Sequence, residues 1–98
     1  MVNVGGKDIT SRRAVARCNV QMSPATSAAI TSASLPKGDV IAAARIAGIM
    51  AAKRTSDMIP LCHPLQIGAV RIDFEVGETF VAIEAQVDTV DRTGVEME

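Results

Sequence analysis

The sequence predicts an α+β protein in which helices cover one face of an antiparallel sheet. Two segments alternate apolar and polar residues and are joined by a Gly-Glu turn, a pattern typical of a β-hairpin. A third alternating segment lies nearer the N-terminus, and two segments with helical start signals separate it from the hairpin. The order strand, helix, helix, hairpin therefore favours one sheet with a helical layer.

The first strand is predicted over residues 14–22, where every second residue is apolar or small: Ala14, Ala16, Cys18, Val20 and Met22. Ser23-Pro24 then marks the start of a short helix, because Ser is favoured at the N-cap and Pro at the first helical position. We expect this helix to end near residues 34–36.

A stronger helix is predicted after Lys37-Gly38-Asp39, where Gly38 or Asp39 can provide the cap and no proline follows until Pro60. Two of its stripes are apolar or small. One holds Val40, Ala44, Ala47 and Ala51, and the other holds Ile41, Arg45, Gly48, Ile49 and Ala52. We therefore expect the sheet on one side of this helix and a partner helix on the other.

The hairpin is predicted over residues 67–76 and 80–90, with a turn at Gly77-Glu78. After Thr93-Gly94, residues 95–98 resemble the first turn of a further helix, with acidic groups at the positive end of its dipole. On such a helix Glu96 and Glu98 would lie about 200° apart, so they are not expected to form a paired-carboxylate site on one face.

The composition favours one small domain, residues 1–98, with a thin core. Of the 98 residues 48% are hydrophobic, but Phe74 and Phe80 are the only aromatic ones. A domain of this size buries roughly 60–65% of its unfolded surface and is marginally stable alone. We therefore expect an oligomer.

Charge and apolar runs exclude several classes of function. The 10 basic and 11 acidic residues give a net charge of −1, without the basic excess that nucleic-acid binding needs. Charged residues near the N-terminus argue against a signal peptide, and the apolar run 40–52 is shorter than the roughly 20 residues of a membrane span. We expect a cytoplasmic protein in which Cys18 and Cys62 are reduced thiols.

The most unusual segment is 58–65, which places Cys62 and the single histidine, His63, between Pro60 and Pro64. The prolines predict a rigid loop. A Cys-His nucleophilic pair is disfavoured, because neighbours in an extended segment point to opposite sides. The two cysteines and one histidine lack zinc-site spacing, so no metal or cofactor is predicted, and a simply packed or solvated histidine remains open.

Two basic positions could bind phosphate. Lys37 precedes a helix N-terminus, which attracts anions, although the order of residues differs from that of a P-loop. Taken alone, a solvated lysine beside a capping residue is the favoured interpretation. Lys53-Arg54 suits the negative end of the helix dipole and could equally present a second phosphate contact.

The order of several motifs resembles one family closely. These are Met-Val-Asn-Val, Lys-Gly-Asp-Val, Ala-Arg-Ile-Ala-Gly-Ile-Met-Ala-Ala-Lys-Arg-Thr, Ile-Pro-Leu-Cys-His-Pro-Leu and Thr-Gly-Val-Glu-Met-Glu. Together they resemble the cyclic pyranopterin monophosphate synthases, the molybdenum cofactor biosynthesis protein C family, over nearly the whole chain.

The resemblance implies a ferredoxin-like α+β fold and a homohexamer built as a trimer of dimers, with substrate bound where subunits meet. It implies a lyase that converts (8S)-3′,8-cyclo-7,8-dihydroguanosine 5′-triphosphate to cyclic pyranopterin monophosphate and releases pyrophosphate. The alternative is a ferredoxin-like module that binds a ligand or regulates without catalysis.

The resemblance also implies roles for individual residues. Substrate-binding positions carry over to Leu61, Cys62, His63, Glu96, Met97 and Glu98. Lys37 is expected at the triphosphate and His63 at a proton transfer or a phosphate, so these two are the predicted catalytic residues. Glu98 is expected at the guanidine-like edge of the base.

The family pattern continues beyond Glu-Met-Glu with a helix carrying an Asp and, three residues later, a Lys, and then with a basic tail. We therefore expect the molecule to be longer than these 98 residues. A polypeptide ending at Glu98 is expected to be inactive and poorly soluble, because a helix that should cover the sheet would be missing.

Overall fold

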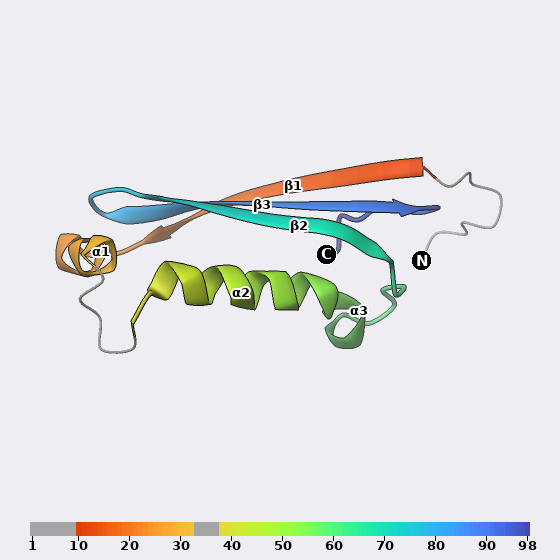
Figure 1. The fold of residues 1–98 in the computed structure, drawn as a ribbon, viewed down its shortest axis with the longest axis horizontal. Helices are drawn as coiled ribbons and strands as arrows, with labels where there is room; N and C mark the ends of the chain where they lie inside the picture. The colour runs from red at the N-terminus through yellow and green to blue at the C-terminus, as the bar shows by residue number, and fades with distance from the viewer. Residues whose placement is uncertain (1–9, 33–37) are drawn as a thin grey trace.

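The computed structural model describes residues 10–32 and 38–98. The elements are β1 (Thr10–Gln21), α1 (Pro24–Thr31), α2 (Val40–Lys53), α3 (Thr55–Met58), β2 (Ile67–Val76) and β3 (Phe80–Asp91). The strands form one antiparallel sheet in the order β1-β3-β2, and α2 runs along one face of it under β2 (Figure 1). This confirms the predicted α+β class, and the strand order is that of the split βαβ unit of a ferredoxin-like fold.

The hairpin is confirmed at the predicted positions. The Gly77 N–H donates to the Phe80 carbonyl at 2.8 Å and closes the turn between β2 and β3. β1 begins at Thr10, four residues before the predicted start, and pairs with the end of β3 as far as Asp91. The sequence did not predict this extension, because Arg12 and Arg13 break the apolar alternation there.

Both predicted helix starts are confirmed by their caps. The Ser23 side chain accepts from the Thr26 N–H at 3.2 Å, and Asp39 accepts from the Ala42 N–H at 3.0 Å. α1 ends at Thr31, earlier than the predicted 34–36. The Thr31 hydroxyl donates to the Ser27 carbonyl at 3.2 Å, a local bond of the kind that competes with helix continuation.

α2 packs closely on β2 through its second predicted stripe. A side chain at Gly48 would collide with Ile72, so glycine permits the close approach of helix and sheet. Arg45 donates from Nε to the Ile72 carbonyl at 3.0 Å, and its guanidinium lies 5.3 Å from the centre of the Phe74 ring. The predicted contact with the sheet is thus confirmed, while Met50 on the other side of α2 is 52% exposed.

The core is thin and the molecule is long. Among the described residues the buried hydrophobic side chains are Ala52, Ile72, Val81, Val87 and Val95. The principal extents are 53 × 21 × 20 Å, and the radius of gyration is 16.4 Å, against about 13 Å for a compact domain of this length. In the described part of the chain, no helix is both long and apolar enough to cross a lipid bilayer.

The first helical turn predicted at Val95 is not assigned as helix within the described residues. Residues 95–98 contain a turn at Glu96 and Met97 and no helix. Tertiary contacts fix this segment instead, because Val95 is only 1% exposed within the core and Glu98 is bonded to Cys62.

Candidate functional site

The proline-bracketed segment forms a tight turn. The Cys62 N–H donates to the Ile59 carbonyl at 3.4 Å, and Leu61 has φ +63°. Pro60 followed by a residue of positive φ fits a type II turn, in which the position of Leu61 is ordinarily occupied by glycine. A left-handed leucine costs about 1–2 kcal/mol, so the surrounding structure must hold this turn in place.

Two buried threonines anchor the segments that flank this turn. Thr55, at the start of α3, donates from its hydroxyl to the Ala51 carbonyl at 3.0 Å. Thr89 on β3 is 1% exposed and donates to the carbonyl of Gln66, just before β2. Both ends of the loop are therefore attached to regular structure.

Val95 anchors the other side of the site. Its side chain packs in the cluster formed with Ala52 of α2 and Val87 of β3. The residues after it consequently lie on the same side of the sheet as α2, where Figure 1 places the C-terminal end. This burial brings residues 96–98 to the loop.

Between these two segments lies a pocket of about 350 Å³. Its lining includes the six residues that the family resemblance implies for substrate binding: Leu61, Cys62, His63, Glu96, Met97 and Glu98. Pro60, Leu65, Thr93 and Gly94 complete the lining. The two predicted binding segments, more than 30 residues apart in sequence, thus form opposite sides of one cavity.

Glu98 and Cys62 meet in this pocket. The Cys62 Sγ lies 3.5 Å from Oε2 of Glu98, and it also lies 3.7 Å from the His63 carbonyl oxygen. Partial burial raises the pKa of the Cys62 thiol, and the hydrogen bond and negative charge of Glu98 raise that pKa further. The other oxygen of Glu98, Oε1, is buried and has no hydrogen-bond partner among the described residues.

Glu96 lies over the backbone of Gly94. A Cβ atom at Gly94 would overlap the Glu96 carboxylate, so the glycine leaves the space that this carboxylate occupies. Both carboxylates therefore line the pocket. The two side chains share this lining, and the expectation that they do not form a paired-carboxylate site stays a prediction.

His63 is exposed at the pocket wall. Within residues 10–32 and 38–98 its imidazole has no hydrogen-bond partner, so both ring nitrogens can face a ligand. The thiol of Cys62 contacts the backbone oxygen of His63 and not the ring. This geometry agrees with the expectation that the two side chains do not form a nucleophilic pair.

Lys37 lies outside the described residues. Gly38, which follows it, stands at the start of α2, whereas α3 and the loop lie at the opposite end of that helix (Figure 1). Lys53 and Arg54 are at the loop end of α2 but are not part of the pocket lining. His63 is thus the one residue of the described lining that can carry positive charge.

Cys18 and Cys62 are both free thiols, as predicted. In the described ranges no group of three or more His, Cys, Asp or Glu side chains is arranged to hold a metal ion.

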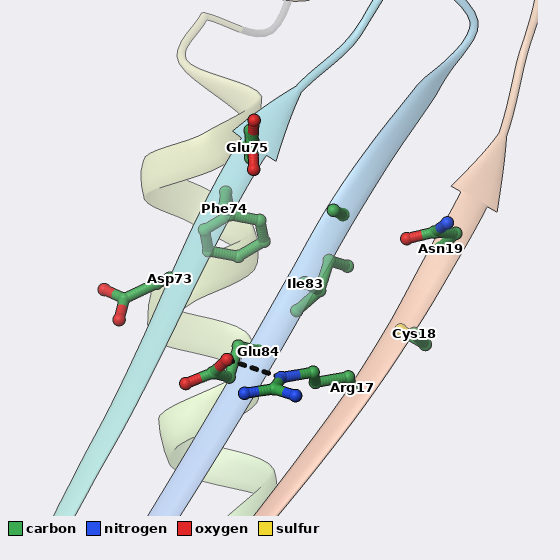
Figure 2. A pocket seen from close by; sticks show the side chains of 9 residues that line it. Arg17, Cys18, Asn19, Asp73, Phe74, Glu75, Ile83 and Glu84 are labelled. Atoms are coloured by element: carbon green, nitrogen blue, oxygen red, sulfur yellow. Dashed lines mark hydrogen bonds and ion pairs between the residues drawn. The ribbon is translucent and has the colours of Figure 1, made fainter.

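A second hollow, of about 430 Å³, lies on the sheet itself and crosses all three strands (Figure 2). Figure 2 shows the Arg17 side chain of β1 reaching Glu84 of β3, where Nε and Oε2 are 2.7 Å apart. Asp73, on β2, is paired with Arg71 at 3.4 Å. These are ordinary ion pairs on an exposed sheet face, so the charges of Arg17, Glu84 and Asp73 already have partners.

The sequence did not indicate Gly94 and Val95 as parts of the site. Gly94 could have been found only from the space that Glu96 requires, which depends on the fold. Val95 is apolar, but the sequence pattern indicates that this residue belongs to the first turn of a helix. Its role is to position the carboxylates that follow it.

Comparison with known proteins shows which family the chain resembles. The model of the MoaC family matches residues 1–98. The chain is 54% identical over 98 residues to the cyclic pyranopterin monophosphate synthase of Streptomyces avermitilis, and 53% identical over 98 residues to that of Streptomyces coelicolor. It is 57% identical over 100 residues to the protein of the same name from a Roseiflexus species.

Each of these alignments covers 100% of this chain, but 58% of the two Streptomyces proteins and 63% of the Roseiflexus protein. The chain therefore spans about three fifths of the length of these curated relatives. The family match over all 98 residues confirms the resemblance seen in the sequence motifs, and the chain belongs to the MoaC family.

Proposed function

We propose that this protein acts in molybdenum cofactor biosynthesis as a cyclic pyranopterin monophosphate synthase. It would be a lyase that converts (8S)-3′,8-cyclo-7,8-dihydroguanosine 5′-triphosphate to cyclic pyranopterin monophosphate with release of pyrophosphate. The observation that carries the proposal is the pocket in which the Leu61-Cys62-His63 turn faces Glu96, Met97 and Glu98. The relatives named for this activity are 53–57% identical to the chain.

The pocket suits the base of such a substrate. Glu98 Oε1 is a buried acceptor without a donor among the described residues, and a guanidine-like edge supplies two N–H donors. Leu61 and Met97 are 78% and 57% exposed, so they can cover the faces of a planar ring. In this proposal Glu98 orients the base and the apolar side chains limit access of water.

His63 is proposed to transfer a proton during ring opening or to donate to a phosphate. Its imidazole lies on the wall of the pocket without a partner in the described part of the chain, so it can reach a bound ligand directly. General acid or base catalysis by a placed histidine contributes typically 10²–10⁴-fold.

The phosphates need more positive charge than the described lining offers, because His63 is the one residue there that can carry it. Lys37 is bonded to Gly38 at the start of α2, and the 14 residues of α2 rise about 21 Å toward the loop. This distance is far longer than a lysine side chain. We therefore propose that the Lys37 serving one pocket belongs to a second copy of the chain, in a homo-oligomer, with a hexamer expected from the family resemblance.

The test is to incubate the purified full-length protein with the cyclised dihydroguanosine triphosphate and to measure pyrophosphate and the mass of the product. Equal yields of pyrophosphate and cyclic monophosphate are expected. Glu84→Gln is the matched control, because it removes a carboxylate from the sheet hollow and not from the pocket. Binding of the nucleotide without its conversion would contradict the enzyme and favour the ligand-binding module.

A further inference from the structure

The thiol of Cys62 has two acceptors within reach but only one hydrogen to donate. Oε2 of Glu98 lies 3.5 Å from the sulfur, and the backbone oxygen of His63 lies 3.7 Å from it. The carboxylate is the stronger acceptor, because a charged partner roughly doubles the strength of a hydrogen bond. The shorter contact, to Glu98, is therefore the one in which we place the hydrogen.

Conditions in the pocket keep this hydrogen on the sulfur. Partial burial disfavours the thiolate, and so do the hydrogen bond to Glu98 and its negative charge, so the pKa of Cys62 is raised. A thiolate beside the carboxylate would place two like charges about 3.5 Å apart. Cys62 is thus suited to donate a hydrogen bond and poorly suited to act as a nucleophile.

The backbone holds both partners in position. The Ile59–Cys62 turn, with Leu61 at φ +63°, fixes the direction of the Cys62 side chain. The buried Val95 fixes the segment that carries Glu98. The two side chains therefore approach each other from segments that are each anchored to the core.

The two oxygens of Glu98 consequently differ. Oε2 is occupied by the thiol, whereas Oε1 is buried without a partner in the described residues. An unpaired buried acceptor costs free energy until a donor arrives. A ligand that brings an N–H group to Oε1 would remove that cost.

We propose that Cys62 is a positioning residue: its protonated thiol holds Oε2 of Glu98 and so leaves Oε1 directed at the N–H donors of the bound base. The role in catalysis rests on the proposed function. The coupling between thiol and carboxylate does not, and it can be measured without substrate.

The first test measures the alkylation of Cys62 by iodoacetamide as a function of pH, with peptide mass spectrometry to separate it from Cys18. Cys18 is exposed on β1 and serves as the reference within the same molecule. In Glu98→Gln the midpoint for Cys62 is expected to move to lower pH, with its rate near pH 7 at least about twofold higher, because each pKa unit changes the thiolate fraction about tenfold. The midpoint for Cys18 should not move. An unchanged midpoint for Cys62 would overturn the coupling.

The second test compares Cys62→Ala with Cys62→Ser in steady-state kinetics. Alanine removes the donor, and KM is expected to rise about tenfold, with a smaller change in kcat, because a hydrogen bond to a charged group contributes about 1.5–3 kcal/mol. Serine retains an O–H donor and should recover most of the lost affinity. Equal KM values for the two variants would contradict a donor role. If the protein had no turnover at all while the alkylation midpoint still shifted, the proposed function would fail and the coupling would stand.

Discussion

The pocket beside the loop and the hollow on the sheet are similar in size, about 350 and 430 Å³, but their charges are arranged differently. In the sheet hollow Arg17 and Glu84, on neighbouring strands, form an ion pair at 2.7 Å. In the pocket Glu98 retains a buried oxygen without a partner in the described residues. The paired charges of the hollow stabilise the sheet surface. The unpaired oxygen of Glu98, on the segment that Val95 anchors, is available to a ligand.

The two regions also differ in backbone strain. The hollow is built on regular strands, while the pocket contains Leu61, the one described non-glycine residue with positive φ. Strain of this kind persists where surrounding contacts enforce it, and it is concentrated at binding and catalytic sites. Charge pairing and backbone strain thus favour the same region as the site.

The largest effect is expected from removing the proposed proton-transfer group. In the full-length protein, His63→Ala should lower turnover about 10²-fold or more, and Lys37→Ala should do the same by removing charge at the phosphates. Steady-state pyrophosphate release measures both. Glu84→Gln, in the sheet hollow, should stay near the rate of the unmodified protein. Near-normal rates in His63→Ala and Lys37→Ala would leave both residues with a structural role only.

The next effect concerns the anchor of the pocket. Val95→Ala removes two carbon atoms from a side chain that is 1% exposed, so the free energy of unfolding should fall by about 2 kcal/mol. Urea denaturation followed by circular dichroism gives this value. Val20, on β1, is 47% exposed, and Val20→Ala should change the free energy of unfolding by less than about 0.5 kcal/mol. Equal losses in the two variants would mean that Val95 is not an anchor.

A smaller effect is expected at Leu61. Leu61→Asn replaces a strained leucine with a residue that tolerates positive φ, so the free energy of unfolding should rise by up to about 1 kcal/mol while substrate affinity falls. Gly38 has φ +90° at the other end of α2, and Gly38→Ala should instead lower stability by about 1 kcal/mol. Thermal melts measure the change in stability of both variants, and KM measures the change in substrate affinity of Leu61→Asn. A loss of stability in Leu61→Asn would show that the leucine side chain outweighs the strain.

The smallest effect concerns pH and the outer face of the sheet. Arg13 donates from Nε to Asp88 at 2.7 Å, and this hydrogen bond lowers the pKa of the Asp88 carboxyl. A carboxyl with a lowered pKa in the folded state stabilises the fold above its unfolded pKa, and this contribution is lost as the pH falls through the folded pKa. In Asp88→Asn the free energy of unfolding should therefore fall slightly less steeply as the pH is lowered into the acid range.

Urea midpoints between about pH 7 and pH 2 measure this change. Asp73→Asn is the control, because its pair with Arg71 is longer, at 3.4 Å, and both side chains are more than half exposed. If Asp88→Asn showed the same pH dependence as the unmodified protein, the pair would contribute nothing to the fold.

Most of the fold could be predicted from local signals. Alternation located the hairpin, and Ser23 and Asp39 marked helix starts that the structure confirms. The four-residue helix α3 was not predicted, because it has no apolar period of its own and depends on the buried Thr55. The start of β1 was missed because ion pairs, and not apolar contacts, line its first residues.

The candidate site was predictable residue by residue, but its arrangement was not. The motifs indicated the turn at residues 61–63 and the segment 96–98. Whether these segments meet depends on the burial of Val95, a contact between residues far apart in sequence. The family resemblance assigned Glu96 and Glu98 to substrate binding, and the tertiary structure shows the contacts that bring both of them to one pocket.

The most direct test asks which of the two regions binds the substrate. Isothermal titration of the cyclised nucleotide into His63→Ala, in which turnover is slowed, gives a reference Kd. Glu98→Gln and Glu84→Gln are then each combined with His63→Ala, and the titration is repeated. If the loop pocket is the site, Glu98→Gln should weaken binding about tenfold or more, the scale of a lost hydrogen bond to a charged group, and Glu84→Gln should change Kd by less than about twofold. Weaker binding in Glu84→Gln, with Glu98→Gln unchanged, would place the ligand on the sheet and contradict the account.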